Sequence, residues 1–422
     1  MNFLILGSGG RECAFAWKLE QSTYCKKLYI APGNAGTQAY GINVAMKETD
    51  FEAIANFCLE NSINVVVVGP EAPLVAGIYD YFKQNKNLQK IHIIGPSEMG
   101  AKLEGSKSFA KEFMTRHQIP TAAYKEFTKE NLSEGFDFIE ANEPPFVLKA
   151  DGLAGGKGVV ILEDKQSAKE ELKAMIGEAK FGDASAKVLI EQFLKGIEFS
   201  VFVLSDGENY VILPQAKDYK RIGEGDTGLN TGGMGAISPV PFVTDKLMQK
   251  VEKETIIPTI QGLKKDNITY KGFIYLGFML VEDQPYIIEY NCRMGDPETQ
   301  VVMPRINNDL GDLFIKCAEG KLNEAIVKHT ENAAATVVLV SGGYPESYEK
   351  GKEIFIPNQT ESIVFHAGTT EKEGKLLTNG GRVLALTSFG KNIHEAVSIS
   401  KATAEKIKFE GKYYRQDIGF EF

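Results

Sequence analysis

The chain has 422 residues, of which 43% are hydrophobic and 24% are charged. These proportions are typical of a globular protein and exclude wholesale disorder, and the length suffices for about two to four domains of roughly 100–200 residues each. The 56 acidic and 47 basic residues give a net charge of −9, which argues against a protein devoted to binding nucleic acid.

Neither the first residues nor the cysteines indicate export or membrane insertion. The apolar run at residues 1–7 is short and is followed at once by Arg11 and Glu12, which is not the pattern of a signal peptide. Apolar stretches stay below the ~20 residues needed to cross a bilayer. The five cysteines are scattered without a C-x-x-C pair, which predicts free thiols and no structural zinc site. We therefore expect a cytoplasmic protein with neither a membrane nor a nucleic-acid partner.

Residues 1–95 alternate apolar runs with helical stretches, which predicts a parallel sheet joined by right-handed crossovers. Ligands of such sheets gather at the carboxyl ends of the strands, and glycine- and proline-rich clusters stand there. The predicted strands are residues 3–6, 28–31, 65–68 and 91–94; the predicted helices are 11–21, 51–61 and 72–83; the clusters are 7–10, 32–36 and 69–71.

The pattern changes after residue 95, where paired strands and longer helices follow one another without a repeat. The predicted helices are residues 107–117 and 392–409, and the predicted strands are 146–150, 159–162, 273–281, 285–291, 336–340 and 382–387.

The first motif with chemical meaning is GSGGRE at residues 7–12, between a predicted strand and a predicted helix. Its glycines expose backbone N–H groups at a helix start, which suits an anion, and Arg11 can clamp a phosphate with two hydrogen bonds. Glu12 stands where the dinucleotide fingerprint requires glycine, so the motif is not that fingerprint. The alternative is a tight turn without a ligand, and we favour the anion site because such turns seldom need three glycines.

The second motif is KADGLAGGKG at residues 149–158, between two predicted strands. A Walker loop needs Ser or Thr after its lysine and then a helix, whereas Gly158 follows Lys157 and a strand resumes. The run therefore predicts a glycine hairpin that closes over a triphosphate, with Lys149 as a second cation in fixed position. A glycine-rich surface hairpin without a ligand is the alternative.

The third motif closes the strand at residues 285–291, where Glu289, Asn291 and Arg293 alternate along one face. Neighbouring carboxylate and amide oxygens suit magnesium, which keeps several waters and bridges phosphates. Arg293 can neutralise charge that develops on a phosphate or a carboxylate. A solvated strand edge is the alternative, but the apolar run at 286–288 indicates a covered strand, in which charges need partners.

Two further segments are weaker candidates. The apolar strand at residues 188–194 leads to Glu198 and is a candidate adenine slot, although an ordinary core strand would look the same. Residues 218–235 mix charges, Asn, Thr and paired glycines over a stretch that is long for an unstructured connection. We interpret this second segment as a substrate loop.

Together these segments resemble the ATP-grasp superfamily and, within it, the phosphoribosylamine–glycine ligase family, over nearly the whole chain. The superfamily marks are the glycine hairpin with Lys149 and the Glu289-x-Asn291 pair. The family marks are GGRE at residues 9–12, PGN at 32–34, DTGLNTGGMG at 226–235 and NCRMGDPETQ at 291–300.

The resemblance implies a reaction in which ATP, glycine and 5-phosphoribosylamine give glycinamide ribonucleotide, ADP and phosphate through glycyl phosphate, the second step of de novo purine synthesis. Neither half-reaction needs a protein nucleophile, because charge neutralisation and positioning suffice. The implied partners are these small molecules, with ATP as a substrate, Mg²⁺ (or Mn²⁺) as the metal, and transient contacts with neighbouring enzymes of the pathway.

The resemblance also implies roles for individual residues. For ATP it implies Lys107 and Lys149 on the phosphates, Gly155, Gly156, Lys157 and Gly158 above them, Glu191 and Phe193 at adenine, and Glu198 on ribose. It implies Glu289 and Asn291 as metal ligands and Arg293 as the catalytic residue that stabilises the acyl phosphate. The implied substrate-binding residues are Gly9, Gly10, Arg11, Glu12, Pro32, Gly33 and Asn34 for phosphoribosylamine, and Asp218, Asp296 and Glu298 for the substrate amines.

The expected fold is a multidomain combination of α/β and α+β units. We expect a parallel-sheet N-terminal domain at residues 1–104, an ATP-grasp central domain at 105–325 with a lid at about 121–190, and a mixed α+β C-terminal domain at 326–422. Lid closure should exclude water, because an acyl phosphate otherwise hydrolyses.

Three other functions remain as alternatives. Another ATP-grasp carboxylate–amine ligase or carboxylase would differ in the substrate that triggers ADP release. A nicotinamide-dependent oxidoreductase is disfavoured by Glu12 and by the lack of an acidic residue at the end of the second strand. A nucleotide-binding regulator would not need to keep Glu289, Asn291 and Arg293 together.

Overall fold

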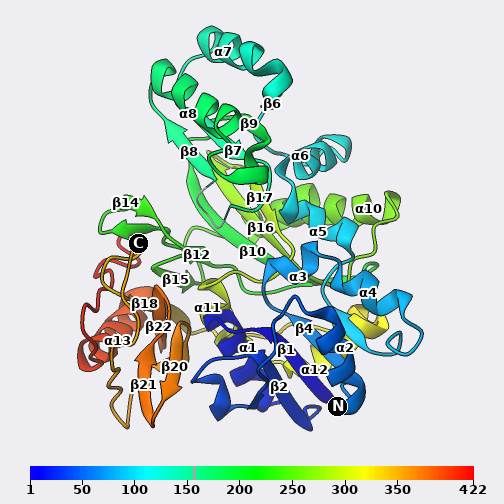
Figure 1. Cartoon of the computed structure of the whole chain (residues 1–422), viewed down its shortest axis with the longest axis vertical. Coiled ribbons are helices and arrows are strands. Elements are labelled where there is room, and N and C mark those ends of the chain that lie inside the picture. The colour runs from blue at the N-terminus through cyan, green and yellow to red at the C-terminus, as the bar shows by residue number, and fades with distance from the viewer. Residues whose placement is uncertain (155–157) are drawn as a thin grey trace.

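The computed structural model of the protein describes residues 1–154 and 158–422. Figure 1 shows the N-terminal and C-terminal sheets side by side at one end of the long axis, and a smaller unit of sheet and helices at the other end. A central antiparallel sheet lies between these parts. In the described residues, no helix is both long enough and apolar enough to span a membrane.

The N-terminal part is the predicted parallel sheet, with every neighbouring pair of strands parallel. Its strands, in spatial order, are β3 (Ile42–Asn43), β2 (Lys27–Pro32), β1 (Asn2–Gly7), β4 (Val65–Val68) and β5 (His92–Ile94). Its helices are α1 (Gly10–Glu20), α2 (Phe51–Glu60), α3 (Glu71–Val75), α4 (Ile78–Gln84) and α5 (Glu98–Gly105). The predicted helix at residues 72–83 is wrong as a single element, because Gly77 has a left-handed φ of +83° that separates α3 from α4.

The smaller unit is an antiparallel sheet covered by two helices and stabilised by its own hydrophobic core, which includes Phe127, Leu148 and Leu172. The strands, in spatial order, are β6 (Tyr124–Thr128), β9 (Lys187–Gln192), β7 (Phe146–Ala150) and β8 (Val159–Leu162). The helices are α7 (Leu132–Ala141) and α8 (Lys165–Gly177). This core is separate from the one that the N-terminal part and the central sheet share.

The central sheet faces this unit and packs against the N-terminal part. Its strands, in spatial order, are β11 (Tyr210–Ile212), β10 (Ile197–Ser205), β16 (Gly272–Val281) and β17 (Gln284–Asn291). The accompanying helices are α6 (Lys107–Arg116), α9 (Asp245–Val251) and α10 (Ile257–Lys265). Leu4 and Val66 of the N-terminal sheet share one hydrophobic core with Phe199 and Ile274 of the central sheet, so the two parts form a continuous body.

The C-terminal sheet takes strands from two distant regions of the chain, since β15 pairs with β18. Its strands, in spatial order, are β12 (Lys217–Asp218), β15 (Gly235–Ser238), β18 (Ala333–Val340), β22 (Arg382–Gly390) and β19 (Ile363–His366). Nearby elements are the hairpins β13 (Arg221–Gly223) with β14 (Thr227–Asn230) and β20 (Thr369–Lys372) with β21 (Lys375–Thr378), and the helices α11 (Glu298–Arg305) and α13 (Ile393–Lys406). The helix α12 (Leu310–Glu319) instead contacts β5 and α1 of the N-terminal part. The prediction of an unstructured loop at residues 218–235 is therefore wrong: the segment forms the β13–β14 hairpin, whose turn includes Gly225 and Asp226 at positive φ.

Candidate active site

Two lysines and a glutamate meet where the smaller sheet faces β17. Lys149 on β7 donates to the carbonyl oxygen of Ile288 at 3.0 Å and lies 3.0 Å from Glu191 Oε2 on the neighbouring strand β9. Lys111 of α6 reaches the same Glu191 oxygen at 3.0 Å. Burial raises the pKa of Glu191, but the two lysines outweigh it and hold that pKa below its usual value. Glu191 therefore stays ionised and fixes the position of Lys149.

Lys107 begins α6 and lies beside this cluster. Asp151, directly after β7, accepts a hydrogen bond from the backbone N–H of Ser108 at 2.7 Å and so connects the start of α6 to the smaller sheet. Lys107 Nζ donates to the carbonyl of Gly152 at 3.4 Å. Burial and then the positive charge of Lys149 lower the pKa of Lys107. Because these two lysine cations repel each other, a polyphosphate anion bound between them would stabilise both.

The predicted metal ligands lie on β17, next to these lysines. A β-bulge at Ile288 interrupts the register between β17 and β16. As a result Ile287 and Tyr290 are both buried in the core, whereas Glu289 and Asn291 lie together on the opposite, partly exposed face. The bulged residue also provides the carbonyl that Lys149 binds. The lysine cluster and the acid–amide pair thus share one end of the central sheet.

The Glu289–Asn291 pair has the chemistry of a site for a hard divalent cation. A Cβ on Gly277, opposite Glu289, would lie 2.8 Å from Glu289 Cγ, so glycine leaves room for the carboxylate. The hydrogen-bonding groups around the Asn291 amide are satisfied when its nitrogen donates to Glu104 Oε1 at 3.1 Å and to the Tyr290 carbonyl at 3.3 Å. That orientation leaves the amide oxygen for a cation, and one or two protein oxygens are the usual number when Mg²⁺ also binds phosphates.

An acidic cluster surrounds Lys220 close to the same pair. Lys220 Nζ lies 2.9 Å from Glu198 Oε2, 3.8 Å from Glu289 Oε1 and 4.0 Å from Asp218 Oδ1. Burial lowers the pKa of Lys220, but the carboxylates outweigh this and raise it well above the usual value. Burial, followed by the charge of Asp218, raises the pKa of Glu298 to about 7. One lysine cannot neutralise so many carboxylates, so the cluster is suited to a further cation such as a substrate amine.

Arg293 follows β17, and carboxylates from two other segments hold its guanidinium. Its Nη2 donates to Glu104 Oε1 at 2.6 Å, and its Nε lies 3.5 Å from Glu71 Oε2. The buried Nε has no hydrogen-bond acceptor within the described part of the chain. Burial raises the pKa of Glu71, but the charge of Arg293, a backbone hydrogen bond and the charge of Arg11 together outweigh it and hold that pKa below its usual value. Glu71 belongs to the third predicted glycine- and proline-rich cluster, which therefore reaches the site.

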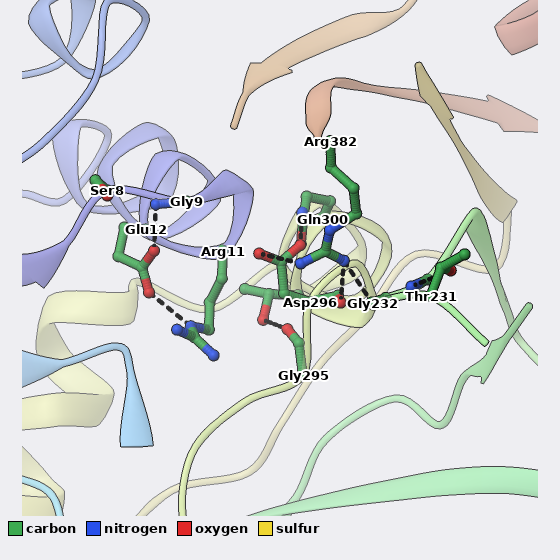
Figure 2. A network of polar contacts seen from close by, with 12 residues as sticks. Ser8, Gly9, Arg11, Glu12, Thr231, Gly232, Gly295, Asp296, Gln300 and Arg382 are labelled. Atoms are coloured by element: carbon green, nitrogen blue, oxygen red, sulfur yellow. Dashed lines mark hydrogen bonds and ion pairs between the residues drawn. The ribbon is translucent and has the colours of Figure 1, made fainter. Parts of the chain in front are cut away.

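The turn at residues 7–12 keeps its own charges paired (Figure 2). The backbone N–H of Gly9 donates to Glu12 Oε2 at 2.6 Å, and Arg11 Nε donates to Glu12 Oε1 at 2.6 Å. Arg11 Nη1 also donates to the carbonyl of Met294 at 3.2 Å. Glu12 thus caps the start of α1 and orients Arg11 toward the segment that follows β17.

Asp296 and Gln300 lie opposite this turn (Figure 2). Gln300 Nε2 donates to Asp296 Oδ1 at 2.6 Å, and a Cβ on Gly10 would lie only 2.3 Å from that nitrogen. Arg382, at the start of β22, donates to the carbonyls of Gly232 at 2.6 Å and of Asp296 at 2.5 Å. Family marks from three distant parts of the sequence therefore meet here, together with the C-terminal sheet.

The second predicted glycine- and proline-rich cluster, at residues 32–36, is hydrogen-bonded to the C-terminal sheet through Asn34. Pro32 ends β2, and Gly33 follows with a left-handed φ of +72°. Asn34 Nδ2 donates to the carbonyls of Ser8 at 2.8 Å and of His366 at 2.9 Å. Asn34 thus holds the shape of the N-terminal edge, and direct contact with a substrate stays a prediction.

The glycine hairpin and the adenine slot are the remaining predicted features. Gly158 is buried, and its carbonyl accepts from the N–H of Ala150 at 2.8 Å. Phe193 is partly buried in the connection between β9 and β10. Three predicted phosphate-binding residues lie outside the described residues: Gly155, Gly156 and Lys157.

Sequence reasoning missed several charged or polar residues that hold these groups. Lys111 was detectable, because it lies four residues after Lys107 and shares its side of the predicted helix. Glu71 was detectable from its place at a strand end. Glu104 and Arg382 lie in ordinary helix and strand contexts, and no motif distinguishes them.

Comparisons with known proteins cover almost the whole chain. Family models of phosphoribosylglycinamide synthetase match the N domain at residues 1–104, the ATP-grasp (A) domain at 105–299 and the C domain at 334–421. The chain is 44% identical over 426 residues to the phosphoribosylamine–glycine ligase of Haemophilus influenzae, covering 100% of this chain and 98% of that protein.

Solved structures agree with these matches. The phosphoribosylamine–glycine ligase of Thermotoga maritima is similar with a TM-score of 0.85 and 39% identity, covering 99% of this chain and 100% of that one. The biotin carboxylase domain of the 2-oxoglutarate carboxylase of Hydrogenobacter thermophilus, crystallised with MgADP and bicarbonate, is similar with a TM-score of 0.72. It is 17% identical, with 97% and 91% of the two chains covered, so it shares the fold.

Proposed function

The chain belongs to the phosphoribosylglycinamide synthetase family, and from this premise we propose that it ligates glycine to 5-phosphoribosylamine. The reaction consumes ATP, forms a C–N bond and yields glycinamide ribonucleotide, ADP and phosphate in the second step of purine biosynthesis. One observation carries the proposal beyond family membership. The Lys149–Glu191 pair, the Glu289–Asn291 pair and the acidic cluster around Lys220 lie at one end of the central sheet.

We propose that the first step makes the glycine carboxylate electrophilic. A carboxylate oxygen attacks the γ-phosphorus of ATP, the bond from that phosphorus to the β–γ bridging oxygen breaks, and glycyl phosphate and ADP form. Lys107 and Lys149 are assigned to the phosphates, since both are held near β17 by contacts of their own. A magnesium or manganese ion held by Glu289 and Asn291 would neutralise charge on the phosphate oxygens.

In the second step the amine of phosphoribosylamine attacks the carbonyl carbon of glycyl phosphate, phosphate leaves, and the new amide nitrogen loses a proton. Arg293 is assigned to the leaving phosphate, a role supported by its fixed place beside Asn291. Asp218 and Glu298 are assigned to the substrate amines, because they belong to a cluster with more carboxyl groups than Lys220 alone can neutralise. Asp296 lies with Gln300 and Arg382 instead, which supports a role near Gly9–Glu12 on the phosphoribosylamine side.

The smaller sheet-and-helix unit is proposed as the lid, at about residues 121–190. Its separate hydrophobic core supports movement as one body. Closing this unit, which itself carries Lys149, over Lys107 and the Glu289–Asn291 pair would exclude water from glycyl phosphate. The proposal keeps Glu191 and Phe193 at adenine, Glu198 on ribose, and the predicted domain limits of 1–104, 105–325 and 326–422.

We also propose that the protein is located in the cytoplasm, because all five cysteines are free thiols.

A coupled assay of ADP release tests the function. We expect ADP to form with glycine and phosphoribosylamine together, with Mg²⁺ or Mn²⁺ present, and to stop when the metal is chelated. ADP release that depends on bicarbonate instead of glycine would establish a carboxylase and refute the ligase. Parallel reactions with Mg²⁺ and with Mn²⁺ identify the preferred ion.

A further inference from the structure

The strand that carries Asp218 is anchored from behind by a residue near the end of the chain. β12 contains Lys217 and Asp218, lies at the edge of its sheet and pairs with β15. Strand alternation places Lys217 and Tyr219 on the face opposite Asp218. Glu421 contacts both of them: Oε1 lies 3.1 Å from Lys217 Nζ, and Oε2 accepts from the Tyr219 hydroxyl at 2.8 Å. One carboxylate thus binds the residues on either side of Asp218.

The contact with Tyr219 is buried and well defined. Tyr219 is 1% exposed, and its ring lies 5.0 Å from Lys217 Nζ and 5.3 Å from the Arg415 guanidinium carbon. Burial, and then the charge of Glu421, raise the pKa of Tyr219, so its hydroxyl stays protonated and donates. Cations near the ring and a carboxylate at its hydroxyl leave the side chain little freedom.

A second set of contacts holds the hairpin that follows β12. Arg415 is fully buried and donates to Asp226 Oδ1 at 2.6 Å and to Asp417 Oδ1 at 2.8 Å. Asp417 Oδ2 accepts from the backbone N–H of Gly225 at 2.7 Å. Figure 1 shows this last segment, in red, running beside β14. Residues 415–421 therefore contact the segment 217–226 at both of its ends.

We propose that Glu421 is a positioning residue for the ligase reaction, acting through Lys217 and Tyr219 to fix Asp218 in the acidic cluster. The inference rests on the proposed role of Asp218 at a substrate amine. Without the carboxylate, Lys217 would bring an unpaired charge to the back of β12, and the Tyr219 hydroxyl would lose its acceptor. The strand could then shift, and Asp218 would lose its place relative to Lys220, which lies 4.0 Å away.

Kinetics of conservative variants test this role. Glu421→Gln and Tyr219→Phe keep the side-chain volume, and Asp218→Asn removes the charge that they are proposed to position. Glu410→Gln is the control, because Glu410 is an exposed carboxylate in the same C-terminal segment of the chain and lies 3.0 Å from Lys352. We expect Glu421→Gln and Tyr219→Phe to lower kcat/KM for glycine or phosphoribosylamine by roughly tenfold, with the KM for ATP within about threefold and Glu410→Gln unchanged.

The double variant separates positioning from a general loss of stability. If Glu421 acts through Asp218, adding Glu421→Gln to Asp218→Asn should change the residual kcat/KM by less than about twofold. A further tenfold loss in that background, or a Glu421→Gln enzyme that matches Glu410→Gln, would overturn the inference. If Asp218→Asn itself retains full activity, the assignment of Asp218 in the proposed function fails, independently of Glu421.

Discussion

Replacing Glu104 by glutamine should release the end of β17 from the body of the protein. Glu104 is buried and accepts hydrogen bonds from the Cys292 backbone N–H at 2.8 Å, from Arg293 Nη2 at 2.6 Å and from the Asn291 amide at 3.1 Å. It therefore serves three consecutive residues, of which two are assigned to the metal and the leaving phosphate. A glutamine carries one oxygen and one NH₂ group, so whichever way it turns a donor faces a donor.

The contacts set the size of the effect. Removing one partner of a buried ion pair costs about 3–5 kcal/mol. Glu71 keeps part of the compensation for Arg293, because it lies 3.5 Å from the guanidinium. We therefore expect the low end of that range, about 3 kcal/mol of unfolding free energy. Loss of a residue that orients a metal ligand lowers metal affinity or activity by about 10–100-fold, and we expect the same for turnover here.

Urea unfolding and the ADP assay at increasing Mg²⁺ measure the two effects. Glu98→Gln is the matched control, since Glu98 is exposed on the same helix and the change should stay within about 0.5 kcal/mol. Adding Arg293→Met to Glu104→Gln should cost less than the sum of the single changes, because the pair is then removed together. The reasoning is refuted if Glu104→Gln unfolds within about 1 kcal/mol of the control and turns over at a similar rate.

Two further predictions concern the acidic side of the site. Glu289→Gln should reduce ADP formation by at least about 100-fold. Its unfolding free energy should change by no more than about 0.5 kcal/mol, since the Glu289 side chain is 39% exposed. Normal turnover of this variant, with an unchanged circular dichroism spectrum, would refute the assignment of Glu289 as a metal ligand. Glu298 has a pKa of about 7 against an ordinary 4.5, so the folded state binds more protons than the unfolded state between these values. The unfolding free energy should therefore fall as pH rises through that window, and Glu298→Gln should remove up to about 3 kcal/mol of this fall. If the unfolding free energies of the variant and the unmodified protein depend on pH in the same way, the raised pKa of Glu298 is contradicted.

The fold was predictable where a local pattern determines an element. The apolar run at Val65–Val68 is bounded by turn residues, and the predicted strand is confirmed residue for residue. The helix predicted at residues 72–83 is divided by Gly77, whose φ is left-handed. The hydrophobic pattern stays helical on both sides of this glycine, so the pattern alone does not reveal the break. The β13–β14 hairpin was missed for a different reason. Its strands lack hydrophobic alternation, and Asp226 and Gly225 are held by Arg415 and Asp417 from almost 200 residues away.

The candidate site shows the same division between local and long-range causes. Strand ends and glycine turns indicated which segments should converge, because the carboxyl ends of parallel strands lie at one edge and a hairpin lysine needs an anion. The residues that neutralise the site's own charges were not indicated. Glu104 for Arg293, Lys111 for Glu191 and Glu421 for Lys217 are each supplied by a segment 80 or more residues away in the chain. A buried charge requires a partner, but any segment that packs nearby can provide it. The sequence therefore indicates which ligands the site must attract, whereas the fold decides which of its own residues hold the binding groups in place when no ligand is bound.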